Sequence, residues 1–328
     1  MPELQLQVDR DRLDQVQRGA TVVITSPAVF RIAGPGALTC LQGLLTSDLV
    51  KPGDRSLIYG ALLTPKGMIV VDAWVLRQSD GITMIVPPAG HDTTLDVLSR
   101  MLPPRLARVT DQTGSARVAW LLGAHAFQTL AKSGVGIPES AGRITSIGGE
   151  LSPVVVALAT ENAPFVGLAM GLAPAVEALA ARLEAGGARV GTEEDLHAAR
   201  ILAGWPALGA EIDQRTLPQE VRYDEIGGLS YTKGCYTGQE TVARVHFRGH
   251  PNRELRGLRW PGPGPIEGGA ITYGAKEVGT VRSVLQLDDR TLGLGIIRRE
   301  VGAGAEVTAG GRRAVVVGLP FGGEDVEG

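Results

Sequence analysis

The chain has 328 residues, of which 44% are hydrophobic, 20% are charged and only 4% are aromatic. This length exceeds what one hydrophobic core usually serves, so we expect two or three domains with mainly aliphatic cores. The formal net charge of −3 excludes a general attraction to nucleic acid or to acidic membranes. Any basic site must therefore be local.

Taken in chain order, the first two thirds alternate strand-like and helix-like segments. Period-two alternation and apolar runs predict strands at residues 29–32, 57–62, 68–76, 82–86, 118–122, 154–158 and 165–170. Helical spacing of apolar residues predicts helices at residues 37–45, 92–101, 124–132 and 173–185. Because the strands come in adjacent pairs, as antiparallel hairpins do, the sequence predicts two α+β units rather than a doubly wound parallel sheet.

After Arg253 the character of the sequence changes. Strand-like runs between Gly and Pro turns lie at residues 255–260, 270–273, 277–284, 291–297 and 313–317. This pattern predicts a small closed β-barrel of about 70 residues. We therefore expect a main region at residues 1–250 with two α+β subdomains, a barrel domain at 251–321 and a flexible tail at 322–328.

The cysteines and the lengths of the apolar stretches indicate the cellular compartment. Cys40 and Cys235 are too few and too distant for a disulfide framework or for the paired spacing of a metal site. We therefore expect a reducing compartment and no permanently bound metal. Residues 1–18 lack the apolar stretch of a secretory signal, and the longest uncharged apolar stretch, 162–176, is too short for a membrane span. The sequence predicts a soluble, cytoplasmic protein that does not associate with membranes.

One segment near the end of the main region concentrates reactive groups. Thr237 and Glu240 have the spacing of a capping box, which predicts a helix that begins near Gly238. Cys235 then lies just before the positively polarised end of that helix and two residues after Lys233. Both effects favour the thiolate over the thiol, so the segment predicts a reactive cysteine.

Other interpretations of these residues stay open. Cys235 could be a buried structural residue, as Cys40 among its leucines is expected to be. The carboxylates of Glu220 and Asp224 could bind the amino-pyrimidine edge of a pterin through paired hydrogen bonds, or could cap a turn or face solvent. Asp48 could lie in a shared cleft, or could simply be a turn residue at the end of a helix.

A strip of basic residues follows the reactive segment. It contains a single acid, and its basic members are Arg244, His246, Arg248, His250, Arg253, Arg256 and Arg259. Such a strip could receive an anionic partner, either a polyglutamate tail or RNA. The alternative is a solvated strand and loop, and Phe247 is the only aromatic residue there that could stack on bases.

The octapeptide KGCYTGQE at residues 233–240 resembles the signature of the YgfZ-type folate-binding proteins. These are relatives of the aminomethyltransferase (T-protein) of the glycine cleavage system. Three further segments agree in order, namely LQGLLTSD at 41–48, LTPKG at 63–67 and LPQE at 217–220. The resemblance covers nearly the whole chain, and the octapeptide is its most specific part.

This resemblance implies an aminomethyltransferase-like body of antiparallel sheets and helices around a central cleft, followed by a small β-barrel. It implies binding of tetrahydrofolate or a derivative, including polyglutamated forms. It also implies a role in assembling or repairing iron–sulfur enzymes, among them enzymes that modify tRNA. Cys235 takes the place of the family's functional cysteine, Asp48 lines up with the aspartate that assists catalysis in the aminomethyltransferases, and Lys233 completes the predicted catalytic set. The predicted folate-binding set is Glu220, Asp224, Tyr236, Gly238, Gln239, Glu240 and Arg244.

The chain departs from the aminomethyltransferases at one position. In those enzymes the glutamate of an Arg-x-Glu-Ala-Gly segment anchors the pterin, whereas residues 200–204 here read RILAG, with Leu202 in its place. Because leucine accepts no hydrogen bond, pterin recognition would depend on other groups, such as Glu220 or Asp224. The departure favours an accessory factor for iron–sulfur enzymes. A folate-dependent one-carbon transferase and a non-enzymatic RNA- or protein-binding factor stay open as alternatives.

Overall fold

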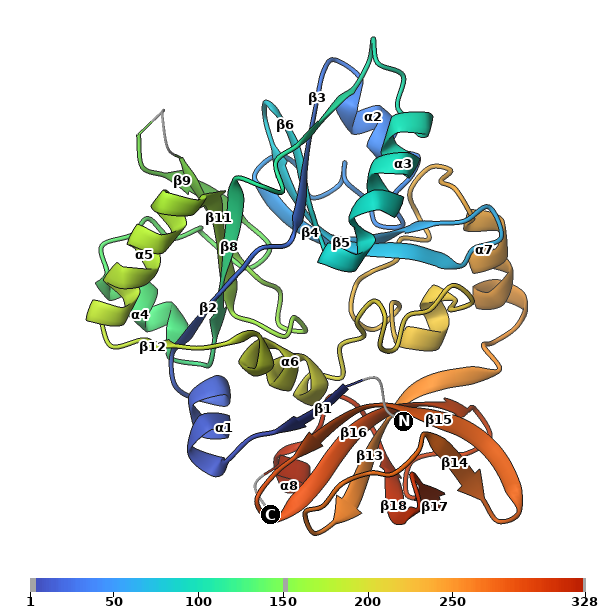
Figure 1. Cartoon of the computed structure of the whole chain (residues 1–328). Coiled ribbons are helices and arrows are strands. Elements are labelled where there is room, and N and C mark those ends of the chain that lie inside the picture. Colours follow the sequence, from blue (N-terminus) through green and yellow to red (C-terminus); the bar gives the residue numbers. More distant parts are fainter. Residues whose placement is uncertain (1–3, 150–152, 327–328) are drawn as a thin grey trace.

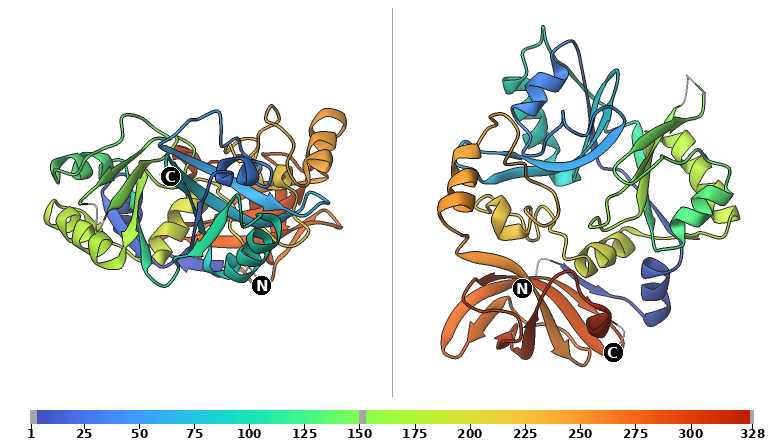
Figure 2. Two further views of the ribbon diagram at one scale, coloured as in Figure 1. Left: turned by 90° about the horizontal axis from the view of Figure 1, so that it is seen from above. Right: turned by 180° about the vertical axis from the view of Figure 1, so that it is seen from behind.

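Three lobes, each built on its own sheet, surround a common centre in the computed structural model, which describes residues 4–149 and 153–326 (Figure 1). The view from behind shows the same ring of lobes (Figure 2). The centre is crossed by the irregular segment that follows the sixth helix, α6 (Glu193–Leu202). This arrangement brings residues from all three lobes to one place.

The first lobe is a five-stranded antiparallel sheet of order β4-β5-β6-β3-β7. Its elements are β3 (Ala28–Ala33), α2 (Ala37–Gln42), β4 (Ser56–Leu63), β5 (Ile69–Gln78), β6 (Gly81–Val86), the 3-10 turn η1 (Pro88–Gly90), α3 (His91–Met101) and β7 (Arg108–Asp111). Every residue of β4 is buried because its side chains alternate between two faces that are both covered by packed cores. Ile58 and Leu62 pack in the core of the lobe, whereas Tyr59, Ala61 and Leu63 pack in the central core.

The second lobe is a six-stranded sheet of order β12-β2-β8-β11-β10-β9, with helices on one face (Figure 1). Its elements are β2 (Thr21–Thr25), β8 (Ala116–Leu122), α4 (Ala126–Lys132), β9 (Ile144–Ile147), β10 (Val154–Leu158), β11 (Gly167–Leu172), α5 (Ala173–Ala185) and β12 (Arg189–Val190). The pairs are antiparallel except for β12 with β2. Along β8, Ala119 and Leu121 pack with α5, whereas Val118 and Trp120 belong to the core on the other face.

The third lobe is a six-stranded antiparallel barrel that closes through pairing of β15 with β16. Its strands are β13 (Arg253–Pro261), β14 (Ala270–Tyr273), β15 (Lys276–Gln286), β16 (Arg290–Arg298), β17 (Glu306–Ala309) and β18 (Arg312–Val317). The N-terminal strand β1 (Leu4–Gln7) pairs in parallel with β15, and α1 (Arg10–Gln17) leads from it to the second lobe. The remaining elements are η2 (Pro218–Val221), α7 (Gln239–Arg248) and α8 (Gly323–Val326).

The predicted α+β class, the paired antiparallel strands and the closed barrel are confirmed. Three local expectations are wrong. The helix predicted at 37–45 ends at Gln42, because the chain turns at Gly43. The tail predicted at 322–328 instead forms α8, where Asp325 and Val326 are buried and Asp325 pairs with Arg259 at 3.2 Å. Residues 327–328 lie outside the described part of the chain.

The third correction concerns the start of α7. The capping box predicted from Thr237 and Glu240 does not form, because Gly238 takes the N-cap position with a left-handed φ of 81°. Its backbone is open to this conformation because it lacks a Cβ. A side chain there would also collide with the carbonyl oxygen of Thr64 at 2.6 Å. Helix α7 begins at Gln239, in agreement with the start predicted near Gly238, and close packing against the β4–β5 turn fixes this start.

Candidate functional site

The segments that carry the resemblance meet in space. Thr237 donates its backbone N–H to Gly43 at 3.1 Å, and Ser230 donates to Thr46 at 3.0 Å. Gly67 of the β4–β5 turn lies so close to α7 that an added Cβ would be 2.9 Å from the Thr241 side chain. The octapeptide loop therefore rests on both the 41–48 segment and the β4–β5 turn.

Lys233 holds this assembly together. Its Nζ donates to the carbonyl oxygens of Gln42, Leu45 and Ser47 at 2.6, 2.7 and 3.0 Å. The side chain is buried, and burial lowers the pKa of Lys233 to about 8. All three N–H bonds of the ammonium are used on carbonyls at and just after the C-terminal end of α2, where the helix dipole also favours a cation. This geometry gives Lys233 a structural role, whereas its predicted catalytic role stays a prediction.

Cys235 is exposed, in contrast to Cys40, which is half-buried beside the core of the first lobe. Gly234, the neighbour of Cys235, has open space where a side chain would project. The thiol is therefore accessible to a partner or a reagent, as a reactive cysteine requires.

Asp48 lines a cavity of about 270 Å³ together with Tyr59, Trp74 and Ser230. Its Oδ1 accepts hydrogen bonds from the Gln42 amide at 3.0 Å and from the backbone of Val50 at 2.8 Å and Lys51 at 3.1 Å. Partial burial raises the pKa of Asp48, but the hydrogen bonds from Lys51, Gln42 and Val50 outweigh it and hold that pKa below its usual value. The sequence left open whether Asp48 lies in a cleft or in a turn, and in the structure it both caps a turn and lines a cavity.

The predicted folate-binding residues are spread around η2 and α7. Glu220 forms an ion pair with Arg253, with distances of 2.9 and 3.2 Å, and also accepts the Leu217 backbone N–H at 3.0 Å. Asp224 is exposed and accepts a hydrogen bond from Tyr231. Tyr236 is buried, and burial raises its pKa to about 12. Gln239 accepts the Tyr236 backbone N–H at 3.3 Å, and Glu240 and Arg244 are exposed.

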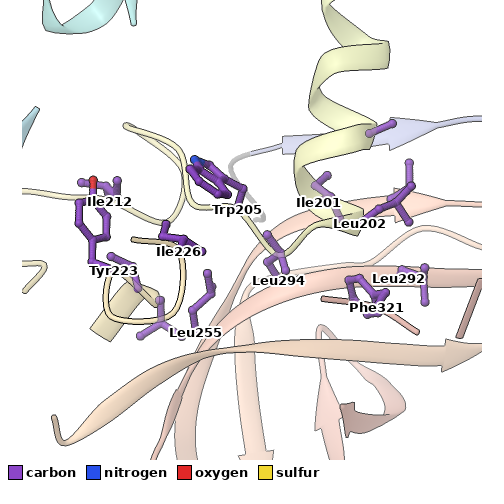
Figure 3. Packing of buried hydrophobic residues seen from close by; sticks show 14 of the residues in the cluster. Ile201, Leu202, Trp205, Ile212, Tyr223, Ile226, Leu255, Leu292, Leu294 and Phe321 are labelled. Carbon is purple, nitrogen blue, oxygen red and sulfur yellow. The ribbon is translucent and has the colours of Figure 1, made fainter. Parts of the chain in front are cut away.

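Leu202 ends α6 at the junction with the barrel. It is buried with Leu292 and Phe321, and Figure 3 shows these side chains between α6 and the barrel strands. Phe321 also donates its backbone N–H to the Leu202 carbonyl at 3.0 Å. The leucine therefore serves packing between the helix and the barrel.

Aromatic side chains fill the centre of the molecule. Three of the four tryptophans of the chain lie there, although aromatic residues make up only 4% of the sequence. Trp74 stacks on Trp205 with ring centroids 5.4 Å apart and an interplanar angle of 15°, and it meets Phe165 edge-on at 4.8 Å. The group, which we call the aromatic cluster, consists of Tyr59, Trp74, Trp120, Phe165, Trp205 and Tyr223.

A second cavity, of about 430 Å³, opens beside the aromatic cluster, and we call it the Asp72 cavity. Its walls are mainly apolar, and its polar side chains include Asp72, His197 and Arg200. Trp74 lines both this cavity and the cavity of Asp48. Trp74 therefore forms part of the boundary between the two cavities.

Asp72 is the group in the Asp72 cavity whose hydrogen bonding is incomplete. It lies on β5, where Val71 and Ala73 face the core of the first lobe. Its Oδ2 accepts a hydrogen bond from the Tyr59 hydroxyl at 3.1 Å, whereas Oδ1 is buried without a partner among the described residues. Burial raises the pKa of Asp72 to about 6. A buried carboxylate with a free oxygen is costly to maintain, so it is a marker of a ligand site.

A buried polar network forms another side of the Asp72 cavity. Arg200 pairs with Glu211 at 2.9 Å and donates to Ser283 of the barrel at 2.8 Å. Its Nε donates to Nδ1 of His197 at 3.3 Å, so the ring proton of neutral His197 resides on Nε2. Burial, and then the charge of Arg200, lower the pKa of His197 to about 4. At neutral pH this wall therefore presents an uncharged imidazole beside a fixed guanidinium.

Known proteins resemble this chain in sequence and in architecture. The family described as GCVT N-terminal domain matches residues 12–140. The tRNA-modifying protein YgfZ of Cronobacter sakazakii (strain ATCC BAA-894) is 30% identical over 276 residues, which cover 81% of this chain and 80% of that protein. The chain belongs to the YgfZ family. The tRNA-modifying protein YgfZ of Klebsiella pneumoniae (strain 342) is also 30% identical, over 277 residues.

The fold of this YgfZ-family chain is that of an aminomethyltransferase. The crystal structure of the glycine cleavage system aminomethyltransferase T from Bartonella henselae matches it with a TM-score of 0.76 and 18% identity, over 95% of this chain and 89% of that one. The family resemblance and the fold predicted from the sequence are thus confirmed. Within residues 4–149 and 153–326, no helix is long and apolar enough to cross a membrane.

Sequence reasoning on this YgfZ-family chain missed Asp72 and its surroundings. The signal was present in β5, where one acid lies two residues before a tryptophan within the apolar part of the strand. Residues two apart on a strand share a face, so Asp72 and Trp74 were bound to face the same side. The helix α6, which supplies His197 and Arg200, was not predicted either.

Proposed function

We propose that this YgfZ-family chain binds tetrahydrofolate or a derivative and acts in the cytoplasm as an accessory factor for iron–sulfur enzymes. The proposal includes enzymes that modify tRNA, since its curated relatives carry the name tRNA-modifying protein. The aminomethyltransferase fold supports the folate part. The role toward iron–sulfur enzymes rests on the resemblance of residues 233–240 alone.

The observation that carries the folate proposal is the free Oδ1 of Asp72 in an aromatic-lined cavity. A reduced pterin is a flat ring system with several N–H donors along its pyrimidine edge. Indole rings such as that of Trp74 offer flat apolar surfaces, and a carboxylate oxygen accepts an N–H in a charge-assisted hydrogen bond. The Asp72 cavity has both, so it replaces the carboxylate that the chain lacks at Leu202.

We propose that Cys235 acts outside the Asp72 cavity, as a transient thiolate ligand or as a handler of sulfur or one-carbon groups. Its exposure supports contact with a client protein. The residues predicted to bind folate around η2 and α7 would then serve the tail of the ligand or the client, and Lys233 and Asp48 would shape the loop between them. Their contribution to binding stays a prediction.

Calorimetric titration with tetrahydrofolate under anaerobic conditions tests the folate proposal. The wild type should bind saturably at micromolar concentration. Asp72→Asn should weaken binding about tenfold or more, because the charge-assisted hydrogen bond is lost. Asp11→Asn on α1 is the matched control, since Asp11 is an exposed carboxylate that neither lines the Asp72 cavity nor belongs to the predicted folate-binding set. Unchanged binding by Asp72→Asn, or equal weakening by both substitutions, would show that the pterin does not bind at Asp72.

A separate test addresses the iron–sulfur role. A strain that lacks the gene should regain iron–sulfur enzyme activity with the wild type but not with Cys235→Ala. The purified variant should melt at the same temperature as the wild type. Full rescue by Cys235→Ala would refute the role of the thiol while leaving folate binding intact.

A folate-dependent one-carbon transferase is the second candidate, and Asp72 is the observation that favours it. Its pKa of about 6 lies close to neutral pH, so the carboxyl could exchange a proton with a nitrogen of a bound pterin. Steady turnover of an aminomethyl or methyl donor by the purified protein would establish this function. A single binding event without turnover would leave the accessory role.

A further inference from the structure

The basic strip divides into two parts in the structure. Three of its arginines lie on β13 and are paired with carboxylates, Arg253 with Glu220, Arg256 with Glu254 and Arg259 with Asp325. The part on α7 and just after it has a different character. Residues 241–253 contain no acid, and their exposed basic members are Arg244, His246, Arg248 and His250. The positive charge open to a ligand is thus concentrated on α7 rather than along the whole strip.

A loop of the barrel extends this positive surface. Arg299, which follows β16, lies with its Nη2 3.1 Å from Nε2 of His250. Its backbone N–H donates to the Asn252 carbonyl at 3.1 Å, which fixes the loop beside the end of α7. Arginines from two parts of the chain therefore border the same surface.

Aromatic rings lie among these cations. The Tyr231 ring stacks on His246 with centroids 3.8 Å apart and an interplanar angle of 19°. Phe247 meets His246 edge-on at 4.7 Å and is 69% exposed, more than any other large hydrophobic residue that the structure describes. Of the ten residues of α7, only Val242 is buried, so the helix presents most of its side chains to solvent. We call this surface, with Tyr231, Arg244, His246, Phe247, Arg248 and Arg299, the α7 face.

We propose that the α7 face binds a single-stranded polynucleotide, with bases stacked on Phe247 and the Tyr231–His246 pair and with phosphates paired to Arg244, Arg248 and Arg299. Stacking and phosphate contact on one surface are the two features by which proteins hold unpaired strands. A polyglutamate tail or an acidic peptide would use the arginines but would have no use for an exposed phenylalanine beside stacked rings. This inference is independent of folate binding, since none of these residues lines the Asp72 cavity.

Fluorescence anisotropy with three labelled probes tests the proposal. The probes are an unstructured RNA of about 12 nucleotides, an abasic phosphodiester strand of equal length and a polyglutamate peptide. The full-length protein should bind the RNA about tenfold or more tightly than either of the other two. The affinity for RNA should fall as salt rises, since binding releases counterions.

Single substitutions separate the two kinds of contact. Phe247→Ala should weaken RNA binding about tenfold and leave the abasic strand unaffected, whereas Phe247→Tyr should bind RNA like the wild type. Arg248→Gln should weaken both nucleic-acid probes and reduce the salt slope for RNA by about 0.7. Phe127→Ala on α4 and Arg105→Gln after α3 are matched controls, because both side chains are exposed and neither belongs to the α7 face.

Three results would overturn the proposal. The first is equal affinity for RNA, abasic strand and polyglutamate, which would reveal a general anion surface. The second is wild-type RNA binding by Phe247→Ala. The third is no RNA binding at low salt, which would leave the α7 face as a contact for an acidic protein.

Discussion

The Asp72 cavity and the Cys235 loop are built in opposite ways. The loop is easily recognised in the sequence as a compact motif. In the structure, the ammonium of Lys233 donates all of its hydrogen bonds to three carbonyl oxygens, whereas Cys235 is exposed. The cavity draws its lining from β5, α6, the segment after α6 and other parts of the chain, and one buried carboxylate oxygen in it is unpaired. The contiguous motif thus forms an exposed loop with a fixed backbone, whereas the candidate small-molecule site is assembled from residues distant in the chain.

The Asp72 cavity and the Cys235 loop are connected through the packing of Trp74. Trp74 of the aromatic cluster lines both the Asp72 cavity and the cavity of Asp48, and the loop that carries Cys235 is attached to the segment containing Asp48. A ligand in the Asp72 cavity would therefore influence the loop through packing of Trp74 and Tyr59. Cys235 lines neither cavity, so a ligand in the Asp72 cavity would not contact the thiol directly.

The largest expected effect comes from the polar network of the Asp72 cavity. Glu211→Ala would leave the buried guanidinium of Arg200 without its charge partner, since the two side chains are 7% and 0% exposed. Loss of one partner of a buried pair destabilises by about 3–5 kcal/mol. Urea unfolding monitored by circular dichroism measures the change. Glu225→Ala is the control, because Glu225 pairs with Arg222 but is 60% exposed, and it should cost less than about 1 kcal/mol.

The sequence predicted the sheets, the barrel and the family because each depends on local signals. The apolar run of β10, the short strand-like run of β14 and the glycines after α5 predicted bounds that agree with the structure. The role of Lys233 could not be predicted, since its acceptors lie almost 200 residues earlier in the chain. Glu220 likewise gains its partner, Arg253, only through folding. Sequence patterns locate chemical groups, whereas three-dimensional contacts decide which of them remain free.

The next largest effect tests whether the carboxyl of Asp72 is buried with a raised pKa. Burial raises its folded-state pKa to about 6 from the usual 3.8, so its protonated form stabilises the fold below about pH 4, and this stability is lost as the pH rises through 6. Two pH units correspond to about 3 kcal/mol. Asp72→Asn removes the ionisable group and with it this pH-dependent loss of stability. The unfolding free energy of the variant relative to that of the wild type should therefore increase by about 3 kcal/mol between pH 4 and pH 8. A difference that stays constant across that range, measured by urea unfolding, would show that the carboxyl is not buried in the folded protein.

The smallest effect separates structure from chemistry within the Cys235 loop. Lys233→Met would leave the carbonyls of Gln42, Leu45 and Ser47 without their donor, and unpaired buried groups of this kind cost about 2 kcal/mol. Lys66→Met in the adjacent β4–β5 turn is the matched control and should be neutral, because Lys66 is exposed. Thermal melting gives the stability, and the rate of alkylation of Cys235 reports the loop. Lys233→Met should lower the melting temperature and raise the alkylation rate together, since both follow from a loosened loop. A lower alkylation rate at unchanged stability would instead assign Lys233 to activation of the thiol.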